Sequence, residues 1–171
     1  RHLRNVPDFP IPGIQFKDVS TLFKEPACLH EMSDEITRIY SDKGITKVVG
    51  IESRGFVMGA IVAERLGAGF VMGRKPGKLP ADTRRQEYGK EYGKDVIEIH
   101  TDALDKNDVV LIQDDLLATG GSAKAAIDLV RSFGVKKIYC NFIIDLRIEG
   151  LKGREFIGDS AEVTSLLTIE E

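Results

Sequence analysis

The stretch Val109-Val110-Leu111-Ile112-Gln113-Asp114-Asp115-Leu116-Leu117-Ala118-Thr119-Gly120-Gly121-Ser122 decides the fold of this 171-residue chain. Its four leading apolar residues predict a strand buried on both faces, the kind found in parallel sheets. Two carboxylates, Asp114 and Asp115, follow where we expect that strand to end. A helical pattern of apolar residues comes after Ser122, and Gly134 is placed to end that helix.

The small residues from Ala118 to Ser122 predict a phosphate site. Glycines let the backbone curl so that successive N–H groups converge, and the N-terminus of the following helix favours an anion. Asp114 and Asp115 would repel a phosphate, and they suit sugar hydroxyls or a metal ion. A phosphate site next to carboxylates that bind a diol indicates ribose 5-phosphate as the ligand. Neither a Walker A loop nor a dinucleotide-binding fingerprint is present, and a response-regulator acidic pocket would lack the glycine loop.

The segment from Asp114 to Gly121 resembles the phosphoribosyl pyrophosphate signature of the type I phosphoribosyltransferases. Its residue sequence resembles the signature of the adenine-specific members of that family. The resemblance runs from about Val6 to Ile169. It implies an α/β fold with a central, mostly parallel twisted sheet flanked by helices, a small N-terminal hood, and one domain over residues 1–171. It implies ribose-5-phosphate binding by Asp114, Asp115, Ala118, Thr119, Gly120, Gly121 and Ser122.

The N-terminal arm, residues 1–26, carries the run P-D-F-P-I-P-G-I-Q-F-K-D. Its closely spaced prolines exclude a helix there, and the apolar residues between them predict an extended arm packed onto the body. The run resembles the start of the adenine-specific enzymes, where it forms the base-binding hood. The resemblance implies that Phe16 stacks on adenine while the Gln15 carbonyl and Lys17 N–H read the edge of the base. Leu116 is a further adenine-binding candidate.

A second polar loop follows the predicted strand over residues 47–51 and precedes a predicted helix that ends at Leu66. This loop, Glu52-Ser53-Arg54-Gly55, resembles the pyrophosphate loop of the family. The resemblance assigns Ser53 and Arg54 to the pyrophosphate. Such loops often use unusual peptide geometry, so a strained or cis bond is expected near Glu52–Ser53.

A basic run follows the next predicted strand, residues 70–73, and the resemblance places Arg74, Lys75 and Lys78 at the pyrophosphate, with Arg74 reaching a neighbouring subunit. Residues 75–95 carry glycines and prolines and little apolar periodicity, so we expect a flexible catalytic lid loop there.

A tandem repeat, E-Y-G-K-E-Y-G-K, occupies residues 87–94 of that lid. The family's catalytic loop contains E-Y-G once, which makes the register ambiguous. The strand sequence that follows Gly93 matches the family, so Glu91 and Tyr92 are the matching pair. The resemblance implies that Glu91 manages a proton on the purine and that Tyr92 belongs to the lid.

The three polar loops all follow predicted strands of an alternating strand–helix pattern. In a parallel sheet the carboxyl ends of strands share one edge, where ligands bind, so connectivity alone predicts that these loops converge. Gln113 interrupts the apolar strand, and we expect it to hydrogen-bond an adjacent loop.

Composition restricts the class of protein further. A hydrophobic fraction of 42% and a formal net charge of −3 are ordinary for a globular enzyme and imply no cationic surface for nucleic acid. No apolar run is long enough to span a membrane, and no signal peptide is apparent. Cys28 and Cys140 have no metal-binding spacing and are expected to be reduced, in the cytoplasm.

The resemblance implies transfer of a 5-phosphoribosyl group from phosphoribosyl pyrophosphate to adenine, giving AMP and pyrophosphate, by a homodimer. Magnesium is expected as cofactor, held mainly through substrate and water, with Asp114 or Asp115 as the candidate protein ligand. Two alternatives stay open: an enzyme for hypoxanthine, guanine or xanthine, and a non-catalytic regulator that senses phosphoribosyl pyrophosphate.

Overall fold

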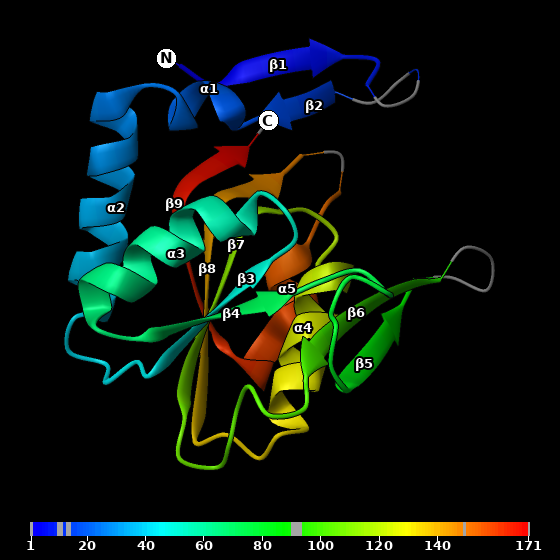
Figure 1. The fold of residues 1–171 in the computed structure, drawn as a ribbon. Coiled ribbons are helices and arrows are strands. Elements are labelled where there is room, and N and C mark those ends of the chain that lie inside the picture. The colour runs from blue at the N-terminus through cyan, green and yellow to red at the C-terminus, as the bar shows by residue number, and fades with distance from the viewer. Residues whose placement is uncertain (1, 10–11, 13–14, 90–93, 149, 171) are drawn as a thin grey trace.

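The computed structural model describes residues 2–9, 12, 15–89, 94–148 and 150–170, without the side chains of Gln15 and Phe16. Helices cover both faces of a central sheet (Figure 1). In chain order the elements are β1 (Arg4–Pro7), β2 (Gln15–Asp18), α1 (Ser20–Phe23), α2 (Pro26–Tyr40), β3 (Lys47–Ile51), α3 (Gly55–Leu66), β4 (Gly69–Gly73), β5 (Thr83–Tyr88), β6 (Asp95–His100), β7 (Val109–Leu117), α4 (Gly121–Arg131), β8 (Lys137–Arg147), α5 (Gly153–Ile157), η1 (Gly158–Ser160) and β9 (Glu162–Glu170).

The central sheet has the strand order β4-β3-β7-β8-β9, and each pairing within it is parallel. The helices α2 and α3 lie on one face, and α4 and α5 lie on the other (Figure 1). The predicted α/β fold with a central parallel sheet between helices is therefore confirmed.

Strand β7 is buried on both faces, as its apolar run predicted. Val110 and Ile112 belong to the core cluster that includes α4, whereas Leu111 belongs to the cluster that includes α2 and α3. All three side chains are at most 1% exposed. Burial of each contributes about 1.5–3 kcal/mol, so this strand anchors both halves of the core.

The N-terminal arm packs onto the body, but the expectation of an arm without a helix is wrong at its end, where Ser20–Phe23 forms the short helix α1. Strands β1 and β2 form an antiparallel hairpin in which Arg4 is opposite Asp18, and the two side chains form an ion pair. The arm joins the core through Val19 and Leu22, which are buried in the same cluster as α2. Because the prolines leave the chain extended, the arm pairs with itself before α1 begins.

The expectation of a loop over the whole of residues 75–95 is wrong for one part. Thr83–Tyr88 is strand β5, which pairs with β6 in an antiparallel hairpin. Its side chains are mostly exposed or partly buried, so no apolar alternation marks it in the sequence. Its regularity comes from β6 and from the segment just after α4, where the Arg84 guanidinium stacks 4.6 Å from the Phe133 ring centroid.

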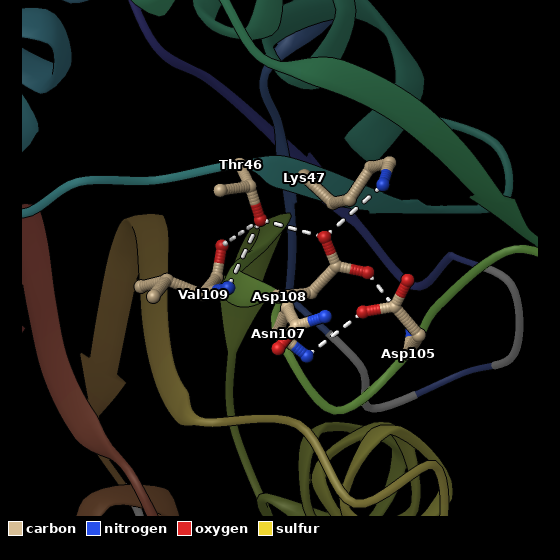
Figure 2. A network of polar contacts seen from close by, with 6 residues as sticks. All are labelled: Thr46, Lys47, Asp105, Asn107, Asp108 and Val109. Carbon is tan, nitrogen blue, oxygen red and sulfur yellow. Dashed lines mark hydrogen bonds and ion pairs between the residues drawn. The ribbon is translucent and has the colours of Figure 1, made fainter.

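Asp108 organises the opposite, amino-terminal edge of the sheet (Figure 2). Its Oδ1 accepts hydrogen bonds from Thr46 Oγ1 at 2.8 Å and Lys47 Nζ at 3.1 Å. Its Oδ2 accepts the Asp105 N–H at 2.9 Å, and the Val109 N–H donates to Thr46 Oγ1 at 2.9 Å. This network fixes the starts of β3 and β7 relative to each other.

The structure also bears on the expectations about membrane spans and cysteines. None of the described helices is long and apolar enough to cross a membrane. Both cysteines carry free thiols, and Cys140 is buried in β8.

Candidate active site

The strand order creates a crevice between the loops that follow β3 and β7. The chain leaves β3 toward β4 on one side and later returns to β7 on the other side. Connections that leave two adjacent parallel strands in opposite directions leave a gap at the strands' carboxyl ends, where α/β proteins bind ligands. The predicted phosphate and pyrophosphate loops are the two loops at this gap.

The loop after β3 has the predicted peptide geometry, since the Glu52–Ser53 bond is cis. Helix α3 begins directly after it, at Gly55. A Cβ on Gly55 would lie 2.6 Å from the backbone oxygen of Gln113. Only glycine therefore allows this helix start to approach β7 so closely, and the approach brings Ser53 and Arg54 to the crevice.

The acidic pair lies inside β7, whereas the sequence placed it after the strand. Strand β7 continues to Leu117 because β8 goes on pairing with it there. Asp115 is buried, and its Oδ2 lies 2.8 Å from the Arg54 Nε. Its N–H donates to Asp114 Oδ1 at 2.8 Å. The predicted diol-binding pair and the predicted pyrophosphate arginine therefore contact each other.

Asp114 has the most perturbed environment of the pair. Burial, and next the negative charge of Asp115, raise the pKa of the Asp114 carboxyl well above its usual range. Hydrogen bonding from the Asp115 N–H and the charge of Arg54 act in the opposite direction. A carboxyl whose charge is disfavoured until a cation or a hydroxyl donor arrives is typical of a binding site.

The predicted phosphate cradle, Ala118 to Ser122, joins β7 to α4. Gly120 has a left-handed φ of 89°, and a Cβ there would lie 2.8 Å from the Gly153 backbone oxygen. The Gly121 N–H donates to Thr119 Oγ1 at 3.3 Å, and α4 starts at Gly121. The turn therefore depends on glycine, and it presents the positive end of an eleven-residue helix to the crevice.

The basic run after β4 lies beside the β3 loop. Arg74 Nε donates to Glu52 Oε1 at 2.7 Å, and the Lys75 N–H reaches the same oxygen at 3.4 Å. Lys78 is exposed, and its N–H donates to the Lys75 carbonyl oxygen at 3.4 Å. The structure thus brings Arg74 and Lys75 to the pyrophosphate loop and leaves Lys78 in solvent.

The four residues assigned to adenine lie in strands β2 and β7. Gln15 and Phe16 are in β2, where their side chains lie outside the described residues. Lys17 follows in the same strand, and its Nζ donates to Asn5 Oδ1 at 2.9 Å. Leu116 is partly buried near the end of β7. Glu91 and Tyr92 lie outside the described residues, so their assignments stay predictions.

A family model described as the phosphoribosyl transferase domain matches residues 18–160, which include both loops of the crevice. The chain belongs to the phosphoribosyl transferase family. An adenine phosphoribosyltransferase of Bacteroides thetaiotaomicron is 60% identical over 169 residues, covering 99% of this chain and 95% of that relative.

Solved structures of family members agree with this fold. The Giardia lamblia APRTase, complexed with 9-deazaadenine, has a TM-score of 0.93 at 45% identity and covers 99% of this chain and 94% of its own. The adenine phosphoribosyl transferase of Trypanosoma brucei, in complex with AMP, pyrophosphate and ribose-5-phosphate, has a TM-score of 0.88 at 26% identity and covers 98% and 76%.

Two residues beside the candidate site went unrecognised in the sequence. Tyr88, in the first copy of the tandem repeat, has its Cδ2 3.9 Å from the position of a Cβ on Gly121. Glu98 accepts the Gly77 N–H at 3.0 Å and the Thr83 hydroxyl at 2.6 Å, which fastens the basic run to the β5–β6 hairpin. The repeat itself was the available indication for Tyr88, because it offers a second tyrosine in the same sequence context.

The carboxylates at this site fit a magnesium ion that is carried by a substrate. Among the described residues no three His, Cys, Asp or Glu side chains form a metal-binding group. Asp115 is already ion-paired with Arg54, which leaves Asp114 as the carboxylate able to contact a cation. Mg²⁺ is commonly held by one or two carboxylates together with phosphate oxygens and water, and this donor set matches that pattern.

Proposed function

We propose that this protein transfers a 5-phosphoribosyl group from phosphoribosyl pyrophosphate to adenine, giving AMP and pyrophosphate. The contact between Arg54 and Asp115 is the observation that carries the proposal, because it brings the pyrophosphate loop and the diol-binding strand to one crevice. The names and bound ligands of the family's similar members supply the nucleobase.

The ribosyl substrate is held at three points. The cradle from Ala118 to Ser122 binds the 5-phosphate through backbone N–H groups and the start of α4. Asp114 and Asp115 accept hydrogen bonds from the ribose hydroxyls and stabilise positive charge on the ring in the transition state. With the phosphate fixed, the anomeric carbon is the part of the substrate that moves.

The leaving pyrophosphate is bound at the other side of the crevice. Ser53 and Arg54 contact it through backbone N–H and guanidinium, and Arg74, Lys75 and Lys78 add positive charge. Asp114 would hold a magnesium ion carried by the pyrophosphate, and the ion would supply positive charge to the leaving group.

Adenine is bound by residues of β2 and β7 and by the lid. Phe16 stacks on adenine, the backbone of Gln15 and Lys17 reads its edge, and Leu116 covers it. Glu91 manages the proton on the imidazole ring as the new bond forms at the anomeric carbon. Tyr92 closes with the lid and excludes water, which would otherwise hydrolyse the same electrophile.

A panel of nucleobases tests the proposal. Adenine, hypoxanthine, guanine and xanthine are each incubated with phosphoribosyl pyrophosphate and magnesium, and the nucleotide and pyrophosphate formed are measured. We expect AMP to form at least about a hundredfold faster than any other nucleotide, because a site that hydrogen-bonds the base edge strongly rejects bases with different donors. Faster turnover of another base contradicts adenine specificity, and ligand binding without pyrophosphate release indicates a regulator.

The proposal includes a cytoplasmic homodimer. Met72 lies on the edge strand β4 and is 42% exposed, and Val57 of α3 is 38% exposed. Exposed apolar side chains on this strand and helix support contact with a second copy, which would place Arg74 near the partner's site. Light scattering after size-exclusion chromatography measures the mass; a monomer at micromolar concentration contradicts this part. The free thiols of Cys28 and Cys140 support a reducing compartment.

A further inference from the structure

A ladder of buried polar side chains crosses the sheet beside the candidate active site. Gln113 of β7, Asn141 of β8 and Thr164 of β9 stand in register on neighbouring strands, and the first two are 0% exposed. Gln113 Nε2 donates to Asn141 Oδ1 at 3.0 Å, and Asn141 Nδ2 donates to Thr164 Oγ1 at 2.9 Å. At the far end, the Tyr40 hydroxyl lies 2.6 Å from Thr164 Oγ1 and 3.1 Å from the Cys140 carbonyl oxygen.

Donor and acceptor requirements give this ladder one direction. The Tyr40 hydroxyl donates to a carbonyl, so the Thr164 hydroxyl must donate to Tyr40 and accept from Asn141. The Asn141 oxygen then faces Gln113 and accepts from its amide. The orientation of the Gln113 carboxamide is therefore set by α2 and β9, and its NH₂ group is turned toward β8.

The second N–H of that amide donates to the Asp114 carbonyl oxygen at 3.1 Å. This bond lies at the point where β7 loses one of its two neighbouring strands. The pairing of β7 with β3 ends at Gln113, although β7 continues to Leu117. Past that point Asp114 keeps β8 as its strand neighbour. The Gln113 amide supplies a hydrogen bond to the Asp114 backbone at the place where β3 no longer does.

Stability alone gives little reason for a glutamine here. Gln113 Oε1 is buried and has no hydrogen-bond partner among the described residues. A buried carbonyl oxygen without a donor is unfavourable, and an apolar residue of similar volume would avoid it. The sequence expectation that Gln113 bonds an adjacent loop is also wrong, because its partners are in β7 and β8.

We infer that Gln113 is a positioning residue, which holds the backbone of Asp114 so that its carboxylate meets the ribose hydroxyls of phosphoribosyl pyrophosphate. The inference rests on the proposed function for the role of Asp114. Asn141, Thr164 and Tyr40 orient Gln113, and of these four residues Gln113 is the one that donates a hydrogen bond to Asp114. The ladder thus ties the position of a substrate-binding carboxylate to the strands β8 and β9.

The test compares Gln113→Met with the double variant Gln113→Met/Asn141→Leu. Methionine keeps the volume and removes the amide, but it leaves Asn141 Oδ1 without its donor. The double variant removes that unpaired group too, so its thermal stability should exceed that of the single variant. Titration calorimetry with phosphoribosyl pyrophosphate and magnesium measures the dissociation constant of each. We expect a roughly tenfold rise in both variants, because small displacements of positioned groups have large effects.

A structural role and a positioning role predict different results for the double variant. If its affinity returns to the wild-type value as its stability recovers, Gln113 only supports the fold and the inference is overturned. Thr46→Val is the stability control, since it removes a hydroxyl from the Asp108 network at the opposite edge of the sheet and leaves the bonds from Gln113 to Asn141 and Asp114 in place. It should lower the melting temperature and leave the dissociation constant within twofold; a rise equal to that of Gln113→Met would also overturn the inference.

Adenine binding separates this inference from the proposed function. In steady-state assays the KM for phosphoribosyl pyrophosphate should rise in both Gln113 variants, whereas the KM for adenine should stay unchanged. A wild-type chain that binds phosphoribosyl pyrophosphate but forms no AMP contradicts the proposed function alone, because the calorimetric comparison still decides the role of Gln113.

Discussion

The Arg54 guanidinium and the Asp115 carboxylate lie 2.8 Å apart, Nε to Oδ2, and join the loop after β3 to strand β7. Asp115 is almost completely buried, whereas Arg54 is partly exposed at the crevice. A buried carboxylate needs its partner, because an uncompensated charge in the interior is strongly unfavourable. The pair therefore supports both the fold and the proposed pyrophosphate site.

Replacing Arg54 with glutamine should lower both the stability of the fold and the affinity for phosphoribosyl pyrophosphate. We expect the free energy of unfolding, measured with urea, to fall by about 1–2 kcal/mol, since the pair is screened on the arginine side. Affinity for phosphoribosyl pyrophosphate should fall at least about tenfold with the loss of a charge-assisted contact. Arg38→Gln is the control, because its pair with Glu35 is exposed, and its unfolding midpoint should not change. Equal behaviour of the two variants would contradict the role of Arg54.

Gly120→Ala should damage the phosphate cradle. The added methyl group would meet the Gly153 backbone oxygen, and the φ of 89° is unfavourable for alanine. The expected loss of stability is about 1–3 kcal/mol, with at least tenfold weaker binding of phosphoribosyl pyrophosphate. Gly134→Ala, at a φ of 75° in open space, carries the backbone strain alone and should keep its affinity. A Gly120→Ala variant with wild-type affinity would show that the cradle tolerates the shift.

Asp114→Asn should separate stability from binding. Because burial raises the pKa of Asp114, the folded state prefers the protonated carboxyl, and stability is lost as pH rises from about 4 through the folded pKa. The asparagine variant should therefore be more stable than wild type at pH 7, by an amount that disappears near pH 3, while it binds phosphoribosyl pyrophosphate more weakly. Urea unfolding across this pH range checks the sign; a variant less stable at pH 7 contradicts it.

Glu91→Leu should slow turnover by roughly a hundredfold or more, the usual effect of losing a proton-transfer group, and should leave AMP binding intact. The tandem repeat offers a matched control in Glu87→Leu. Glu87 is an exposed residue of β5, 3.9 Å from Lys94, and its loss should leave turnover unchanged. If Glu87→Leu is the slow variant, the register of the repeat is reversed.

Asp108→Asn should affect stability without affecting the site (Figure 2). Burial alone would raise the pKa of Asp108, but hydrogen bonds from Asp105, Thr46 and Lys47 outweigh it and lower the pKa. The lowered pKa contributes stability above about pH 4 that is lost as pH falls through the folded pKa. At pH 7 the variant should lose about 1–2 kcal/mol, with the difference shrinking at lower pH and both KM values unchanged. A changed KM would link the two edges of the sheet.

Local sequence determined much of this protein. The strand over residues 47–51 and the helix that ends at Leu66 have the predicted bounds, because apolar periodicity and glycine placement act over a few residues. The order of acidic pair, glycine turn and helix likewise predicted where the cradle would be, since each step depends on its immediate neighbours. The cis bond at Glu52–Ser53 was predicted through the family resemblance.

Tertiary structure alone decided the remainder. Strand β5 has no apolar alternation and is regular because β6 pairs with it. Strand β7 extends past the acidic pair because β8 continues beside it, and Gln113 is buried because Asn141 stands opposite. Each of these features depends on a partner from a distant part of the chain. A sequence gives the donors and charges available, whereas only the packed sheet determines which of them meet.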